Sequence, residues 1–190
     1  MMLEKNADEY MATLCKAIAS IDRKKISEFA DILLEKRDSQ RLILVFGNGG
    51  SATTAAHFVC DLSKMASYGK EKRFRAVCLS DNVPTMMAYA NDVSYSEIFI
   101  EQAKNLAQKG DLAIAISGSG NSPNVLEAID YCNAHGIDTV GICGYGGGQL
   151  SKKAKFTITL ESKDMQVVED AHLAILHCAS RLACGNGDGR

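Results

Sequence analysis

Short apolar runs recur along the chain, and longer amphipathic segments separate them. Five such runs, LILVF, RAVCL, LAIAI, TVGIC and FTITL, occupy residues 42–46, 75–79, 112–116, 139–143 and 156–160. The first and third lack polar alternation, which is typical of central parallel strands covered on both faces. Because helical segments lie between the runs, the pattern predicts an α/β fold: a three-layer, doubly wound, parallel five-stranded sheet.

Two further amphipathic segments precede the first strand. Apolar side chains recur at helical spacing over residues 7–21, and a second helix is predicted over 24–36. Residues 1–40 are therefore interpreted as a helical arm, 41–184 as the main domain and 185–190 as a disordered tail. The arm is predicted to serve oligomerisation, by packing on a partner subunit or along the sheet edge. The alternative is that its helices cover the sheet of their own chain.

The turn after the first strand is rich in glycine. Residues 47–50, GNGG, can form a tight turn with exposed N–H groups, and Ser51 is predicted to cap a helix that begins near Ala52. A helix N-terminus of this kind binds anions, and a phosphate is the expected ligand. The same stretch also matches G-x-G-x-x-A, a weak dinucleotide-binding fingerprint. In that alternative, Asp81 would hold the ribose.

A candidate reactive pair follows in the same predicted helix. His57 and Asp61 are four residues apart, so their side chains share one face, one turn beyond the anion site. Pairs at this spacing are also common as simple surface or core pairs, and that alternative stays open. If the pair is reactive, the phosphate site and the chemistry are adjacent.

A second polar turn follows the third strand. Residues 117–122 read SGSGNS, and Pro123 suits the first position of a helix that Ser122 caps. The hydroxyl and free N–H groups of such a nest can hold a phosphate without lysine or arginine. A Ser/Gly turn without a ligand is the alternative. Because ligands collect at the carboxyl ends of parallel strands, both turns are expected to face one crevice.

Two other loops are expected nearby. Residues 144–148, GYGGG, lack a capping serine and are predicted to form a mobile loop that does not bind phosphate. Asn91 and Asp92 are placed in a loop, after which Ser94 and Glu97 form an S-x-x-E capping box that opens a helix. On the local pattern alone, Asn91 and Asp92 are turn formers.

Composition narrows the class of protein further. The 190 residues suit one domain, and a net charge of −2 with dispersed lysines and arginines favours neither nucleic acid nor an anionic membrane as a partner. Charged residues interrupt the first twenty positions, and no apolar run reaches membrane-spanning length, so a cytoplasmic protein is expected. Seven scattered cysteines indicate reduced thiols rather than a disulfide framework.

The motifs, taken together, resemble the sugar isomerase (SIS) domain family. They are GNGGS at 47–51, AAHFVCD at 55–61, ND at 91–92, SGSGNSPNV at 117–125 and EDAHLAILH at 169–177. The helix with His57 and Asp61, together with the late helix that ends in a histidine, is similar to the phosphoheptose isomerase branch. The resemblance implies a flavodoxin-like SIS fold and an isomerase that converts sedoheptulose 7-phosphate to D-glycero-D-manno-heptose 7-phosphate through an enediol.

The resemblance also implies the site. It assigns zinc, or another divalent metal, to His57, Asp61, Glu169 and His177, with Asp61 and His177 as the acid/base pair. The rise from Glu169 to His177, eight positions along a helix, is about 12 Å, which two side chains converging on one metal can just bridge. His172 is the fallback ligand. The implied substrate contacts are Asn48, Gly49, Gly50, Ser51, Asp61, Asn91, Asp92, Ser117, Gly118, Ser119, Asn121, Ser122 and Glu169.

Three positions depart from the family pattern. Asp61 stands where the family usually has glutamate, Glu169 where it has glutamine, and Gly118 where it has threonine or serine. The family further implies a homotetramer whose N-terminal helices form a central bundle, with active sites between subunits. A non-catalytic relative that binds the initiator DnaA or senses a sugar phosphate is the alternative, but the two histidines and two carboxylates favour an enzyme.

Overall fold

The computed structural model describes residues 2–185, so most of the expected tail lies outside the described residues. Its centre is a parallel sheet of five strands in the order β2-β1-β3-β4-β5. The strands are β1 (Leu42–Gly47), β2 (Arg75–Cys78), β3 (Leu112–Ser117), β4 (Asp138–Cys143) and β5 (Phe156–Thr159). The predicted doubly wound α/β fold is therefore confirmed, and each strand lies within one residue of its predicted bounds.

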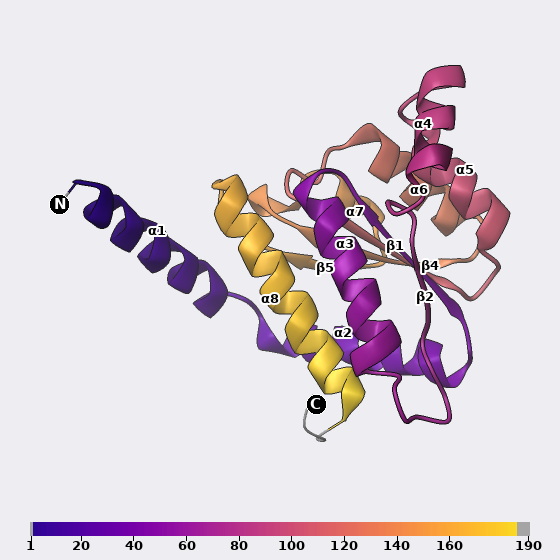
Figure 1. Cartoon of the computed structure of the whole chain (residues 1–190), viewed down its shortest axis with the longest axis horizontal. Helices are drawn as coiled ribbons and strands as arrows, with labels where there is room; N and C mark the ends of the chain where they lie inside the picture. The colour runs from indigo at the N-terminus through magenta and orange to yellow at the C-terminus, as the bar shows by residue number, and fades with distance from the viewer. Residues whose placement is uncertain (1, 186–190) are drawn as a thin grey trace.

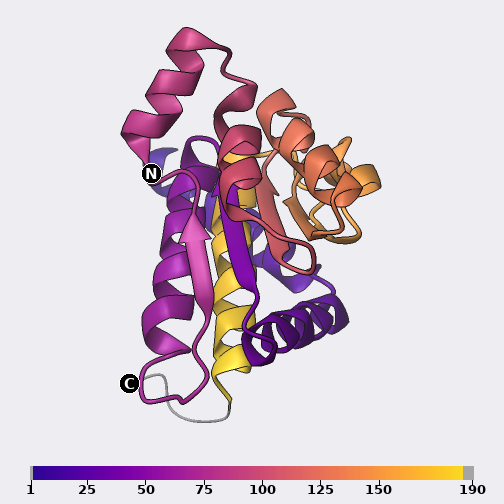
Figure 2. The same cartoon turned by 90° about the vertical axis from the view of Figure 1, so that its right-hand side faces the viewer.

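Alternate side chains of the strands enter two separate cores. Ile43 and Val45 pack with α2 (Arg23–Asp38), α3 (Gly50–Cys60) and α8 (Met165–Cys184). Leu44 and Phe46 point to the other face, where α5 (Glu97–Leu106), α6 (Pro123–Ala134) and α7 (Leu150–Lys153) lie. Figures 1 and 2 show the sheet between these two helical layers. Burial on both faces explains why the central strands are continuously apolar.

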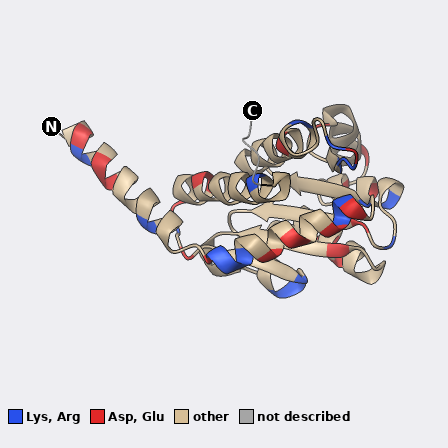
Figure 3. Ribbon diagram, turned by 90° about the horizontal axis from the view of Figure 1, so that it is seen from below, with Lys and Arg blue, Asp and Glu red and all other residues tan. Residues whose placement is uncertain are grey.

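The two N-terminal helices differ in what they contact. α1 (Met2–Ala19) has no buried residue and projects from the body of the molecule (Figure 1). Its link to α8 includes a hydrogen bond of 2.6 Å from the Tyr10 hydroxyl to Asp170. Acidic and basic residues are interspersed along it (Figure 3). α2 instead buries Phe29 and Leu33 in the core, so this second helix covers its own sheet.

The segment between β2 and β3 corrects two predictions. Asn91 and Asp92 are not in a loop, because α4 (Val83–Asp92) includes both in its last turn. The capping box is also absent: α5 begins only at Glu97, with Ser96 at its N-cap. Ser94 lies outside the helix, and its hydroxyl accepts a hydrogen bond from the backbone N–H of Ser96 at 3.2 Å.

The topology places one crevice beside β1. From β1 the chain crosses to β2 on one side and later returns to β3 on the other, so the connections after β1 and β3 diverge. A crevice at such a switch point is where open α/β sheets bind ligands. Within residues 2–185, no helix is long and apolar enough to span a membrane. All seven cysteines are free.

Candidate active site

The first wall of the site is the turn from β1 into α3. A side chain at Gly47 would come within 2.6 Å of the Ile116 carbonyl oxygen, so only glycine fits there. Gly49, with φ of 54°, is the N-cap, and α3 begins at Gly50 rather than near Ala52. The predicted Ser51 cap is therefore wrong: Ser51 is already inside the first turn, and the left-handed Gly49 starts the helix. Residues 48–51 of this turn nevertheless line the crevice.

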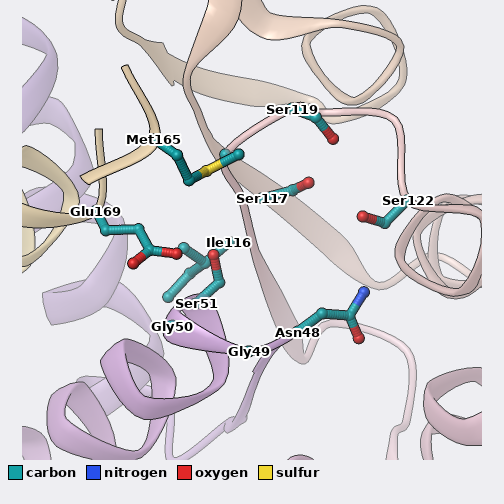
Figure 4. A pocket seen from close by; sticks show the side chains of 11 residues that line it. Asn48, Gly49, Gly50, Ser51, Ile116, Ser117, Ser119, Ser122, Met165 and Glu169 are labelled. Atoms are coloured by element: carbon teal, nitrogen blue, oxygen red, sulfur yellow. The ribbon is translucent and has the colours of Figure 1, made fainter. Parts of the chain in front are cut away.

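The second wall is the loop from β3 into α6. Ser117 accepts a hydrogen bond from the N–H of Gly120 at 3.1 Å, which curls the loop back on itself. Ser122 occupies the predicted N-cap position, but its side chain makes no capping hydrogen bond. Figure 4 shows the hydroxyl groups of Ser117, Ser119 and Ser122 directed into the space between the two walls. These hydroxyls are consequently available to a ligand.

The two walls enclose a pocket of about 260 Å³. Its lining contains no lysine, arginine or histidine, so an anion would be held by hydroxyl groups, N–H groups and helix N-termini. The only charged lining residue is Glu169, from α8. The lining residues are Asn48, Gly49, Gly50, Ser51, Ile116, Ser117, Gly118, Ser119, Ser122, Met165 and Glu169. Most of the predicted substrate contacts are thus brought together.

The glycine-rich stretch after β4 supports the second wall. The predicted mobile loop forms a 3-10 turn (Tyr145–Gly147) that packs against residues 117–121. Gly144 donates its N–H to the Gly118 carbonyl at 3.0 Å, and Leu150 donates to Gly120 at 2.9 Å. A Cβ at Gly148 would lie 2.5 Å from the Ser119 carbonyl, so the contact requires glycine on this side. We call residues 144–150 the supporting loop.

Three predicted substrate contacts have other partners. Asn121 accepts from the Gln149 N–H at 3.1 Å and donates to the Ser119 carbonyl at 2.9 Å, so its amide holds the loop. Asn91 donates to Asp92 at 2.7 Å, and both side chains are exposed at the end of α4. None of the three lines the pocket.

A second group of polar side chains lies farther along α3 and α8. Asp61 is the first residue of a π-helical turn (Asp61–Met65) that continues α3. The Nε2 atoms of His57 and His177 are 3.2 Å apart, and Asp61 lies 3.9 Å from the first and 3.6 Å from the second. The His57 and His177 side chains are 49% and 43% exposed, whereas Asp61 is 17% exposed. We call these three residues the His–Asp–His group.

This group has the chemistry and the spacing of a metal site. Its ligand atoms all lie within 4.8 Å of one another. Tetrahedral zinc with bonds of about 2.1 Å separates its ligand atoms by about 3.4 Å, close to the observed spacing. Two imidazole nitrogens and one carboxylate, partly open to solvent, also suit a catalytic ion that keeps a free position. A divalent metal therefore fits the residues present.

The other two residues considered as ligands lie elsewhere. The Glu169 carboxylate stands in the pocket wall beside Gly50, not in the His–Asp–His group. The cause is the helix rise of about 12 Å over eight residues. His172 is only 1% exposed and faces the core, where its ring nitrogens have no hydrogen-bond partner among the described residues. Burial lowers the pKa of His172 to about 4, so it is neutral at physiological pH.

The pocket and the His–Asp–His group share the same two helices. α3 begins at the pocket and carries His57, while α8 carries Glu169 at the pocket and His177 in the group. The offset along α8 is eight residues, or about 12 Å. A ligand that reaches both must therefore be elongated, with an anionic end in the pocket.

Comparison with known proteins identifies the family. The model of the SIS domain family matches residues 8–144. A phosphoheptose isomerase of Helicobacter pylori (strain P12) is 31% identical over 177 residues, 93% of this chain and 91% of its own. One from Geobacter sulfurreducens is 34% identical over 154 residues, 80% of each chain. The solved structure of a phosphoheptose isomerase from Neisseria gonorrhoeae has a TM-score of 0.88 at 24% identity, covering 95% of this chain and 98% of that one.

The chain therefore belongs to the SIS domain family. Within the family, the two curated relatives named above, which match most of its length, are phosphoheptose isomerases. This kinship favours an isomerase over both the dinucleotide-binding and the non-catalytic alternatives.

Proposed function

We propose that this protein is an aldose–ketose isomerase that converts sedoheptulose 7-phosphate to D-glycero-D-manno-heptose 7-phosphate. The observation that carries the proposal is an anion pocket without lysine, arginine or histidine, offset from the His–Asp–His group by a rise of about 12 Å along α8. A seven-carbon sugar with a terminal phosphate is elongated in the required way. The phosphoheptose isomerase relatives support the same substrate.

In this proposal, the two loops at the switch point bind the phosphate of the substrate. Ser119 and Ser122 donate their hydroxyl groups, and the N-termini of α3 and α6 add backbone N–H groups. Hydrogen bonds to a charged phosphate are stronger than those to neutral groups. Anchoring one end of the substrate places its carbonyl end near the reactive side chains, which lowers the entropic part of the barrier.

The isomerisation moves one proton between neighbouring carbons and one between their oxygens. Asp61 takes the proton from C1 of the ketose and returns it to C2 of the enediol that forms. His177 donates a proton to O2 and accepts one from O1, so the hydrogen count of the sugar is unchanged. One Asp61 carboxylate oxygen lies 3.9 Å from His57 Nε2 and the other 3.6 Å from His177 Nε2, so the carboxylate faces both imidazoles.

The same group is the proposed zinc site. His57, Asp61 and His177 would each hold the ion through one atom, which leaves the second Asp61 oxygen and the other ring nitrogen of His177 for proton transfer. Glu169 is left as a sugar contact at the pocket. When bound, the metal supplies a Lewis acid that polarises the carbonyl oxygen. Shortening the usual glutamate to Asp61 withdraws the carboxylate by about 1.5 Å, a displacement large enough to change the preferred sugar.

The proposed assembly is a cytoplasmic homotetramer with active sites between subunits. The support is α1, which buries nothing within its own chain and exposes Met2, Leu3 and Met11. In a lone monomer, the apolar face of an amphipathic helix of this length would stay in water, so a partner subunit is expected to cover it. Light scattering of the full chain tests the number of subunits.

Direct turnover tests the function. The purified chain, supplied with Zn²⁺, is incubated with sedoheptulose 7-phosphate in D₂O, and the sugar is followed by NMR for the aldose and for deuterium at the exchanged carbon. Conversion is expected with this ketose. In a parallel thermal-shift assay, the sugar phosphate should raise Tm and NAD should not. A chain that converts no ketose phosphate but binds DnaA would contradict the proposal.

A further inference from the structure

One side chain of the pocket wall, Asn48, is held by two residues that have no assigned role. Its amide exchanges two hydrogen bonds of 2.9 Å with the amide of Asn124, one in each direction. It also accepts a hydrogen bond of 3.0 Å from the Tyr95 hydroxyl. Asn124 comes from the first turn of α6 and Tyr95 from the connection between α4 and α5. Three separate segments therefore meet at Asn48.

The side-chain amide of Asn124 cannot flip to exchange its oxygen and nitrogen. It is only 1% exposed, and its side-chain oxygen also accepts the backbone N–H of Val125 at 3.0 Å. A flipped amide would turn its NH₂ group toward that N–H, so two donors would face each other in a buried site. The oxygen of Asn124 is thus fixed, and it requires a donor from Asn48.

The amide of Asn48 is consequently fixed as well. Its oxygen has two lone pairs, and these are used by Asn124 and Tyr95. Its nitrogen has two N–H groups, and one goes to Asn124. One N–H is left. Figure 4 shows the Asn48 nitrogen on the side of the pocket where Ser122 lies, with the oxygen turned away.

We propose that Asn124 and Tyr95 are positioning residues that make Asn48 a donor of one N–H group to an oxygen of the bound sugar phosphate. This inference rests on the proposed function and adds a determinant of ligand selection to it. A ligand that presents an oxygen acceptor beside Ser122 is accepted, and one that presents a donor there is rejected. Without Tyr95, the Asn48 oxygen regains a free lone pair, and the amide is less firmly oriented.

Tyr95 offers the cleaner test, because it is 56% exposed and its loss leaves the core intact. Tyr95→Phe removes the hydroxyl and keeps the ring. We expect KM for sedoheptulose 7-phosphate to rise about fivefold while kcat stays within about twofold, because ground-state binding weakens and Asp61 is untouched. Tyr68→Phe, at an exposed position that does not line the pocket, is the matched control and should change neither constant.

A double-mutant cycle decides whether Tyr95 acts through Asn48. The dissociation constants of sedoheptulose 7-phosphate and of inorganic phosphate are measured by calorimetry for Asn48→Ala, Tyr95→Phe and the double variant. If Tyr95 acts through Asn48, Tyr95→Phe changes affinity by less than about twofold in the Asn48→Ala background. A full fivefold effect in that background would overturn the proposal, since Tyr95 would then contact the ligand or act on the fold directly.

The second positioning residue is tested by an isosteric change. Asn124→Asp keeps the acceptor for Val125 and Asn48 but cannot donate to the Asn48 oxygen. We expect weaker binding of both ligands with an unchanged circular dichroism spectrum, and unchanged binding would overturn the role of Asn124. Because calorimetry needs no turnover, a chain that binds phosphate in this pattern without isomerising the sugar refutes the proposed function alone. A chain that binds neither ligand refutes both.

Discussion

The phosphate pocket and the His–Asp–His group lie on the same helices but are held in different ways. The pocket is made of backbone turns that are tied to one another, such as the Gly144 and Leu150 N–H groups bound to the loop after β3. The His–Asp–His group is made of side chains on helix surfaces, and two of its three members are nearly half exposed. The shape of the pocket is therefore fixed by folding, whereas the His–Asp–His group is open to solvent on the side where the proposed ion would bind.

The largest expected effect separates chemistry from binding. Asp61→Asn should lower kcat about a thousandfold, because the amide cannot accept the carbon proton. The affinity for inorganic phosphate should not change, since Asp61 lies outside the pocket. Steady-state kinetics and calorimetry measure the two quantities, and Asp31→Asn on the exposed side of α2 is the control. Near-normal turnover in Asp61→Asn would show that Asp61 is not the base, and Glu169 or His177 would then be assigned that role.

The next effect concerns the metal. His57→Ala should reduce metal affinity by more than about a hundredfold, because one of three ligands is lost. Elemental analysis of untagged protein should give one zinc, or another divalent ion, per chain, and a chelator should remove both the metal and the turnover. His135→Ala, at an exposed position outside the group, should keep the metal. A wild-type chain that is active and metal-free would refute the site.

A smaller effect is expected at the pocket itself. Ser119→Ala and Ser122→Ala should each raise KM about tenfold, since each removes one hydrogen bond to a charged group. The kcat of both variants should stay close to that of the wild type, because phosphate anchoring is equal in the ground state and the transition state. Ser39→Ala, at the exposed C-cap of α2, serves as the control. A fall in kcat without a change in KM would place these serines in the chemistry.

The last effect is on stability rather than on turnover or binding, and it distinguishes the buried from the exposed histidine of α8. Burial lowers the pKa of His172 from 6.5 to about 4. Between these values the unfolded chain binds more protons than the folded one, so stability falls as pH drops through that window. From about pH 7.5 to about pH 5, the wild type should lose about 2 kcal/mol more than His172→Leu. Urea unfolding at both pH values measures this, and an equal loss in both proteins would contradict it.

The strands were predictable because burial on both faces of the sheet requires a continuous run of apolar residues in the sequence. LILVF and LAIAI have no polar residue, and each is followed by a polar turn that ends it. Parallel strands alone predict that both polar turns lie at the carboxyl edge of the sheet. The pocket was for this reason largely foreseen from residues 47–51 and 117–122. The switch point depends on the strand order, which only the fold shows.

The parts that were missed depend on contacts distant in the sequence. Asn91 and Asp92 read as turn formers, yet α4 extends through them after Asn82 caps its start. The supporting loop reads as a mobile glycine stretch, because its partners at 117–121 are visible only in the fold. Asn124 follows a proline at a helix start, and nothing local indicates that it is buried against Asn48. The π-helical turn at Asp61 has no sequence signal that we recognise.

The supporting loop also has a consequence for protein engineering. Residues 117–122 keep their shape partly through hydrogen bonds from Gly144, Gln149 and Leu150, which belong to the connection after the next strand. A graft of SGSGNS alone into another α/β protein would lose these donors and should not reproduce the pocket. The transferable unit is the pair of connections, so exchanges between relatives that aim at new sugar preferences should move both together.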